Sequence, residues 1–521
     1  MLELLEWGRK HGDEAADTES DSKSAGASLA GLGDAEPSTA LGELAARLEA
    51  HSGGAGDAGA RHEALALIQD AGAAHVAALL ARCIAGTAGT LAAREATWKS
   101  LADYQSRLAR ALCSSAGAQF TAQSAARALS ACRTLAKIQL VHYESVPGKL
   151  WHVAYAIHAA AESVGCSTLQ VHAQSGQRTV TTVEQELLRL LMLRVSAPDM
   201  MAPEQIEVAD RVVEQLGADF TLRQPGVADN PFCFEPGSEF APQRARERQP
   251  DASARYFGPG MGYDSLGRIA RQLGTGKLED FKPFGKDMSP RVQSSAVQHL
   301  LTFWHADCPY SRPAHSPASG TLQAVHGYGQ LWQHLCGAQQ GAGELSLAES
   351  SAGVPQPPET WELRGTGGGE LGAQVPQASR AWVKCGEVVG LQAGGDGGGW
   401  IGILRRMQTE PGGGLHADIA VLSRKPQAVS LREVLEQYED SVFTDASSRQ
   451  FAQNRVHAVI LSDGAETSQP PNLLLTPERW KEGRIYELQA GEGARYLRGL
   501  QLVRRGDDYV RATFEWVSAA D

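Results

Sequence analysis

The stretch "WVKCGEVVGLQAGGDGGGWIGILRRM", residues 382–407, decides the fold class of the C-terminal part of this chain. Apolar side chains recur at every second position on both sides of a glycine-rich segment: Val389, Leu391 and Ala393 before it, Ile401 and Ile403 after it. Period-two alternation is typical of β-strands, and glycine lets the chain reverse between them. The stretch therefore predicts a β-hairpin that is followed by two arginines, Arg405 and Arg406.

Further strands are predicted on both sides of this hairpin. Strand-like segments are "LQAVHGYG", "TWEL", "HADIAVLS", "RVHAVILSD", "NLLLT" and "RIYELQA". The chain closes with a second hairpin, in which Val510, Ala512, Phe514 and Trp516 alternate after a turn at Gly506-Asp507. Many short strands joined by tight turns favour a small closed barrel. We therefore predict an antiparallel β-barrel with extra strands over residues 319–521.

The N-terminal part has a different pattern. Residues 1–60 are acidic, rich in Ala, Gly and Ser and poor in large apolar side chains, which predicts a disordered segment. Residues 61–217 follow the helical period and predict an α-helical domain. Residues 218–318 gain Pro, Gly and aromatic residues and are interpreted as a mixed linker or support region of short strands, loops and two helices. The predicted fold class is thus α+β, with several domains.

Composition limits the classes of function. The 521 residues include 48 Lys and Arg against 60 Asp and Glu, so the net charge of −12 is unsuited to coating a nucleic-acid polymer. The eight cysteines form no CxxC pair and are expected to be reduced thiols of a cytoplasmic protein. No run of about 18 uncharged apolar residues occurs, so we expect no membrane span.

Motifs for catalysis and cofactor binding are incomplete. Gly367, Gly369 and Gly372 satisfy GxGxxG, but a proline and a strand follow where a dinucleotide site needs a helix. The turns "GTGKL" and "FGKD" lack the Ser or Thr that follows the lysine of a phosphate loop. Neither GxSxG nor HExxH occurs. The sequence therefore predicts no enzyme and no cofactor.

Three histidines and a cysteine near residue 310 are candidate metal ligands. His305, Cys308, His315 and His326 lie near one another in the sequence, but a structural zinc site needs four ligands, usually in two close pairs. The second pair is missing. We therefore interpret these residues as core or surface side chains and predict no metal site.

Three arginines are candidates for anion binding. Arg312 precedes the first predicted barrel strand, and Arg405 and Arg406 follow the opening hairpin. A planar guanidinium engages two phosphate oxygens at once, so arginines beside a barrel form a phosphate clamp. The alternative is that they are solvated residues at a strand end.

The order "WEL", a glycine-rich turn, "WVKCGEVVGL", a hairpin, "WIGILRR" and "ADIAVL" resembles the PilZ-type β-barrel, a bacterial receptor module for cyclic di-GMP. The upstream segments "TWKSLADYQSRLARAL" and "YESVPGKLWHVAYAIHAAAE" resemble the helical half of long cytosolic proteins that carry such a barrel at the C-terminal end. The resemblance covers most of the chain after residue 60. It implies a cyclic di-GMP effector with no catalytic role.

The ligand motifs of that family are degenerate in this chain. An RxxxR arm normally holds phosphates, but here Arg312 is followed four positions later by Ser316, with His315 beside it. A D/N-x-S-x-x-G turn normally contacts guanine, but Gly365, Gly367 and Glu370 stand at its three fixed positions. Arg244 and Arg248 satisfy RxxxR far upstream and are interpreted as a solvated basic loop. The resemblance therefore implies ligand contacts through Arg312, His315, Arg405 and Arg406 only, with nucleotide binding weakened or lost.

Three functions are considered. The first is a cyclic di-GMP effector with weak or altered recognition. The second is a ligand-independent adaptor whose helical half and apolar tip, residues 2–7, dock on unidentified protein partners. The third, ranked well below these, is an uncatalogued hydrolase, because a sequence does not show which carboxylates meet in space.

Overall fold

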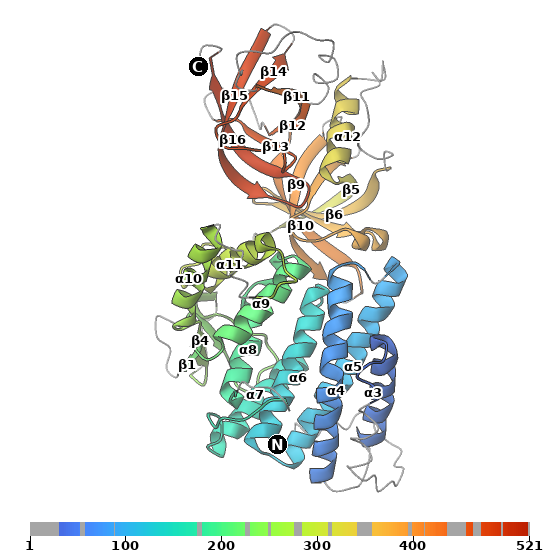
Figure 1. Ribbon diagram of the computed structural model, residues 1–521, viewed down its shortest axis with the longest axis vertical. Coiled ribbons are helices and arrows are strands. Elements are labelled where there is room, and N and C mark those ends of the chain that lie inside the picture. The colour runs from blue at the N-terminus through green and yellow to red at the C-terminus, as the bar shows by residue number, and fades with distance from the viewer. Residues whose placement is uncertain are drawn as a thin grey trace. The chain divides into compact units, whose positions relative to one another are not determined.

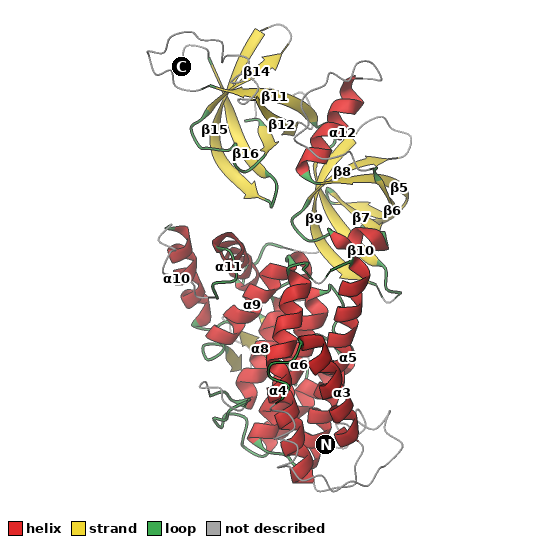
Figure 2. Cartoon of the chain, turned by 45° about the vertical axis from the view of Figure 1, so that its right-hand side comes forward, coloured by secondary structure: helices red, strands yellow, loops and turns green. Residues whose placement is uncertain are grey.

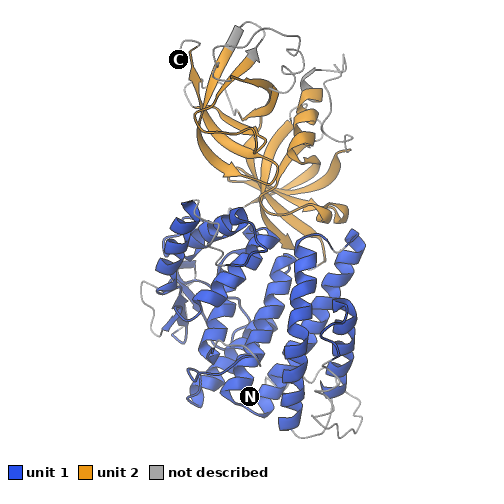
Figure 3. Cartoon of the chain, viewed as in Figure 1, with its two compact units in different colours: residues 1–311 blue, residues 312–521 orange. Residues whose placement is uncertain are grey.

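The chain forms two compact units, residues 1–311 and residues 312–521 (Figure 3). The computed structural model describes residues 31–518 except 53–57, 88, 175–179, 224–229, 248–251, 276–283, 311–314, 341–356, 394–398, 411, 435–454, 462–469 and 491–492. The fold class predicted from the sequence is confirmed, since a helical N-terminal half precedes antiparallel β-barrels.

Unit 1 is built around a series of long helices that pack side by side (Figure 1). Their apolar faces meet in one continuous core, which includes Leu101, Leu129 and Leu190. Pro203 begins α9 and Gly217 follows its last residue, which are favoured positions for proline and glycine at helix ends. The helices are α3 (Pro37–Ser52), α4 (Ala58–Ile84), α5 (Leu91–Ala118), α6 (Ala122–Val141), α7 (Gly148–Ser163), α8 (Val183–Val195), α9 (Pro203–Leu216), α10 (Gly262–Gly274) and α11 (Pro290–Trp304).

Helix α3 lies within the segment for which the sequence predicted disorder. Residues 37–52 are helical, and Leu41, Leu44 and Leu48 are buried against the core. Their spacing places these leucines on one helix face. Burial of that face against the core stabilises the helix, although the surrounding sequence is rich in Ala and Gly and poor in large apolar residues. The prediction of disorder was therefore wrong for residues 37–52, and residues 1–30 lie outside the described part of the chain.

Helix α4 is the one described helix that is long and apolar enough to cross a membrane by length and composition. Half of its most apolar window is buried inside the unit, and it carries the buried polar residues Gln69 and His75. Gln69 donates to the backbone oxygen of Arg127 and accepts from the Arg127 guanidinium at 3.0 Å. These contacts are those of a core helix that packs against its neighbours.

A small antiparallel sheet completes unit 1. Its order is β1 (Thr221–Arg223), β4 (Arg255–Gly258), β2 (Phe232–Phe234) and β3 (Gln243–Arg244). The interpretation of Arg244 as a solvated loop residue was wrong, because Arg244 is 8% exposed and its guanidinium donates to the backbone oxygens of Phe303 and His305. The last carbonyls of a helix lack partners within the helix, so Arg244 caps α11. Arg248 lies outside the described residues.

The first half of unit 2 is a closed six-stranded barrel, named here barrel 1 (Figure 2). The opening hairpin is confirmed, since β8 pairs with β9 in antiparallel register, with Leu391 opposite Trp400. The buried residues of barrel 1 include Val388 of β8, Ile403 of β9 and Ala417 of β10. In barrel order the strands are β10 (Leu415–Ser423), β7 (Glu370–Val375), β6 (Glu359–Gly367), β5 (Ser316–His326), β8 (Val388–Ala393) and β9 (Gly399–Thr409).

The strands predicted as additions to barrel 1 close into a barrel of their own, named here barrel 2. Val510, Ala512 and Phe514 are buried and face the inside, as their alternation predicted, whereas Trp516 is 37% exposed. Closure pairs every strand on both sides. In barrel order the strands are β11 (Gln427–Glu433), β12 (Arg455–Leu461), β13 (Asn472–Leu475), β16 (Val510–Val517), β15 (Gly493–Arg505) and β14 (Ile485–Ala490).

Helix α12 (Tyr328–Gln340) packs against both barrels and was not predicted. Leu331 and Leu335 share a buried cluster with Ile401 of barrel 1 and Leu474 of barrel 2. The Tyr328 hydroxyl donates to the backbone oxygen of His457 at 2.7 Å, and a Cβ on Gly390 would lie 2.5 Å from Leu331 Cδ1. Glycine at position 390 therefore lets α12 lie directly on barrel 1.

Candidate functional site on barrel 1

The arginine pair of the opening hairpin lies at a β-bulge. In the β9–β10 ladder Arg406 faces Asp418 and Leu404 faces Ile419, so Arg405 is the extra residue. Consecutive residues on a regular strand point to opposite faces, but here Arg405 donates to Glu370 and Arg406 lies opposite Asp418, so both point to the outer wall of barrel 1.

Two acidic residues on that wall engage the arginines. The Arg405 guanidinium donates to Glu370 Oε1 at 3.0 Å. Glu370 and Asp418 share a face, because Ala420 pairs with Glu370 and Asp418 pairs with Gly372 in the β10–β7 ladder. Glu370 is 4% exposed and Asp418 is 4% exposed, so both carboxylates are buried and need compensating charge.

His315 joins this cluster from the residue before β5. Its Nδ1 lies 3.7 Å from Asp418 Oδ1, and its Nε2 lies 4.0 Å from Glu370 Oε2. His416 Nε2 lies 3.1 Å from the same Asp418 oxygen. Burial opposes the ionisation of Asp418, but the hydrogen bond from His416 and the charges of His416, His315 and Arg406 outweigh it and hold the pKa of Asp418 below its ordinary value.

Two glycines make room for the histidines. A Cβ on Gly365 would lie 3.0 Å from His315 Cβ, and a Cβ on Gly372 would lie 3.1 Å from both His315 Nδ1 and His416 Nε2. Gly365 occupies the position where the PilZ motif has its acid or amide. His315 lies so close to Gly365 that a larger side chain at position 365 would displace it.

The predicted residues are thus brought together only in part. His315, Arg405 and Arg406 lie on one wall, whereas Arg312 lies outside the described residues. The sequence reasoning missed the roles of Glu370, His416 and Asp418. The signal for the last two was "HAD" at residues 416–418, because a strand places residues two apart on the same face.

The earlier metal candidates do not form a cluster of their own. His305 Nδ1 accepts from the backbone N–H of Asp307, Cys308 is buried, and His326 stacks on Trp382 at 4.0 Å between ring centroids. Among the described residues only His315 of the four joins a group with the spacing of metal ligands, together with His416 and Asp418.

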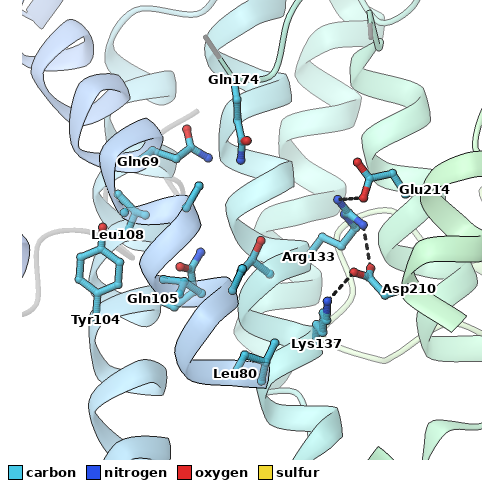
Figure 4. A pocket seen from close by; sticks show the side chains of 15 residues that line it. Gln69, Leu80, Tyr104, Gln105, Leu108, Arg133, Lys137, Gln174, Asp210 and Glu214 are labelled. Carbon is cyan, nitrogen blue, oxygen red and sulfur yellow. Dashed lines mark hydrogen bonds and ion pairs between the residues drawn. The ribbon is translucent and has the colours of Figure 1, made fainter. Parts of the chain in front are cut away.

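Unit 1 contains a pocket of about 220 Å³ that is lined by both apolar and polar side chains (Figure 4). Arg133 and Lys137 lie at one side of it. Arg133 Nη1 lies 2.7 Å from Asp210 Oδ1, and Lys137 Nζ lies 2.9 Å from Asp210 Oδ2. Burial opposes ionisation of Asp210, but the charges of Arg133 and Lys137 outweigh it and lower its pKa to about 2. The pocket is smaller than the roughly 300 Å³ at which small-molecule sites begin, and its cations are engaged by carboxylates. Barrel 1 is therefore the stronger candidate for the ligand site.

Comparison with known proteins gives one match. Residues 23–226 match the family model described as "Cyclic-di-GMP receptor FimW, N-terminal domain". No curated protein and no solved structure matches the chain.

The matched residues cover α3 to α9 and β1, most of the helical part of unit 1. The two closed barrels that follow are consistent with PilZ-like domains. The resemblance inferred from the sequence is therefore confirmed: residues 23–226 are similar to the N-terminal domain of the cyclic-di-GMP receptor FimW.

Proposed function

We propose that the chain is a non-catalytic bacterial signalling protein that receives cyclic di-GMP in the cytoplasm. The observation that carries this proposal is the match of residues 23–226 to a domain of a cyclic di-GMP receptor. The match lies in the helical part of the chain, and the charged residues proposed below to bind the ligand lie in the barrel region that follows it.

The outer wall of barrel 1 is the proposed phosphate-binding surface. Arg405 is 43% exposed at its side chain, and Arg406 and His315 lie beside it on the same wall. Arg312, three residues before His315 in the chain, would complete the set. Guanidinium groups in this arrangement suit the phosphodiesters of a cyclic dinucleotide because they bind anionic oxygens in pairs.

Affinity at this surface is proposed to be weak. Glu370 accepts from Arg405, and Asp418 faces Arg406, so a phosphate has to compete with carboxylates that are already in place. Gly365 and Gly367 offer no side-chain acceptor to a guanine edge. Each missing hydrogen bond removes about 1 kcal/mol, so several together weaken binding by orders of magnitude.

Calorimetric titration of cyclic di-GMP into the untagged full chain tests the proposal. We expect submillimolar binding that weakens about tenfold or more in Arg405→Ala, and that strengthens in Glu370→Gln because Arg405 loses its competing anion. Arg432→Ala is the matched control, since Arg432 pairs with Glu487 on barrel 2 at a similar exposure, 42% against 43%. Binding that Arg405→Ala leaves unchanged would place the nucleotide elsewhere.

A second candidate is a ligand-independent adaptor on the same fold. The ion pair of Arg405 with Glu370 and the position of Arg406 opposite Asp418 favour it, because such opposite charges stabilise the wall without a nucleotide. A flat calorimetric trace from a folded chain would support the adaptor, and capture of one defined protein by residues 1–311 would extend that support.

A further inference from the structure

We propose that His315, His416 and Asp418 form a binding site for a divalent transition-metal ion, of which Zn²⁺ is the best match. The proposal does not depend on nucleotide binding. It rests on the convergence of three ligand atoms, on the absence of a side chain at Gly372, and on two buried polar atoms that have no hydrogen-bond partner among the described residues.

The first support is the geometry of the ligand atoms. One ligand atom from each residue lies within 4.8 Å of the others. The Asp418 Oδ1 atom lies 3.1 Å from His416 Nε2 and 3.7 Å from His315 Nδ1. In a tetrahedral zinc site with bonds of about 2.0–2.1 Å, neighbouring ligand atoms lie about 3.3 Å apart. The two separations from Asp418 Oδ1 lie on either side of that value.

The second support is the space beneath the two rings. The point where a Cβ of residue 372 would lie is 3.1 Å from His315 Nδ1 and 3.1 Å from His416 Nε2, and glycine leaves that point open. Both nitrogens therefore lie close to the same point over the β7 backbone, where residue 372 carries no side chain. Two imidazoles and one carboxylate are a ligand set for zinc with a fourth position left for water, and imidazole nitrogen is a poor ligand for Mg²⁺ or Ca²⁺.

The third support comes from the atoms behind the ligands. His315 Nε2 and Glu370 Oε2 are both buried, have no hydrogen-bond partner among the described residues, and lie 4.0 Å apart. A histidine that binds metal through Nδ1 donates its Nε2 proton to a carboxylate, which orients the ring. Glu370 occupies that position, and Arg405 fixes its other oxygen at 3.0 Å. Metal binding at Nδ1 would thus give both buried atoms a partner.

The test is calorimetric titration of ZnCl₂ into the untagged, chelator-stripped full chain. One Zn²⁺ per chain is expected, with binding weakened at least tenfold in His315→Asn, in His416→Asn and in Asp418→Asn. His334→Asn is the matched control, because His334 lies on α12 outside the cluster. His315 precedes β5 rather than lying in a ladder, so its variant is expected to fold, which circular dichroism checks.

A second pair of variants tests the need for glycine at position 372 without removing a ligand. Gly372→Ala places a methyl group against both nitrogens and is expected to weaken Zn²⁺ binding about tenfold, whereas Gly320→Ala, whose Cβ would meet only Leu363 Cδ2 at 4.0 Å, leaves it unchanged. Co²⁺ in place of Zn²⁺ is expected to give the visible absorption of a tetrahedral site. A folded chain that binds no Zn²⁺, or that binds it equally well in all three ligand variants, overturns the proposal.

Discussion

At the scale of single residues, the outer wall of barrel 1 depends on one register shift. A regular β9 would have turned Arg405 and Arg406 to opposite faces, and the bulge gives each a carboxylate on the same wall. The sequence indicated the arginines and His315, because their residue types suit anions. It did not indicate Glu370 and Asp418 as their partners, since that pairing follows from the register of β7, β9 and β10, which strand patterns leave undetermined.

Glu387 is a second residue whose properties arise from tertiary contacts. Burial is the main reason that its pKa is raised to about 7; Lys384 opposes the rise, while Asp507 and Asp508 add to it. The Lys384 Nζ atom lies 3.8 Å from Glu387 Oε1 and 2.7 Å from Asp507 Oδ2, so the two carboxylates share one ammonium group. The folded chain therefore keeps a proton on Glu387 at pH values where the unfolded chain has lost it.

This gives a pH prediction with a definite sign. The contribution of Glu387 to the free energy of unfolding should fall as pH rises from about 4.5 toward 7 and level off above it, because ionised Glu387 is disfavoured only in the folded state. Glu387→Gln should therefore be more stable than the parent at pH 8, by on the order of 2 kcal/mol, with the difference vanishing near pH 4.5. Urea unfolding at several pH values measures this.

The control for that series is Glu362→Gln, an exposed glutamate that pairs with Arg364 on the same barrel. Its stability should follow the pH profile of the parent chain. An E387Q variant that is no more stable than the parent at pH 8 would contradict the assignment.

At the scale of elements, the barrel strands were easier to predict than the helices α3 and α12. The barrel strands alternate clearly, as in Val510, Ala512 and Phe514. Helix α3 follows a composition typical of disorder, and α12 has only four large apolar residues, Tyr328, Leu331, Trp332 and Leu335, before a glycine-rich segment. That i, i+3, i+4, i+7 spacing was the available signal. Both helices are stabilised by what they pack against.

Because α12 contacts both barrels, its core residues should stabilise both. Leu331→Ala is expected to lower the free energy of unfolding of unit 2 by about 2–5 kcal/mol, as for other buried leucines. Hydrogen exchange followed by mass spectrometry should show protection falling together in β8 of barrel 1 and in β12 of barrel 2. Leu502→Ala, at a leucine that is 39% exposed, is the matched control and should change little. A loss of protection confined to one barrel would contradict the shared role of α12.

At the scale of the whole molecule, each unit has a core of its own. The apolar cluster of unit 1 runs from Leu32 to Trp304, and the clusters of unit 2 draw on residues from Tyr328 to Phe514. Segments with separate cores usually fold separately. The sequence placed the start of the barrel region at residue 319, and the compact units divide at residue 312, just before His315.

Residues 1–311 and 312–521 should therefore fold when they are produced as separate chains. Circular dichroism is expected to report a helical spectrum for the first and a β spectrum for the second, each with a cooperative thermal transition. The full chain should then show both transitions in one scan. A fragment that stays unfolded until it is mixed with the other would contradict separate folding.

Closure of both barrels limits how another protein can recognise this one. A partner that binds by strand addition needs a sheet edge with unpaired backbone groups, and a closed barrel has none. Within the described residues such edges remain only in the small sheet of unit 1, at β1 and β3. A partner that docks on the barrels must therefore contact their side chains. On the outer wall of barrel 1 the charged side chains then decide what binds.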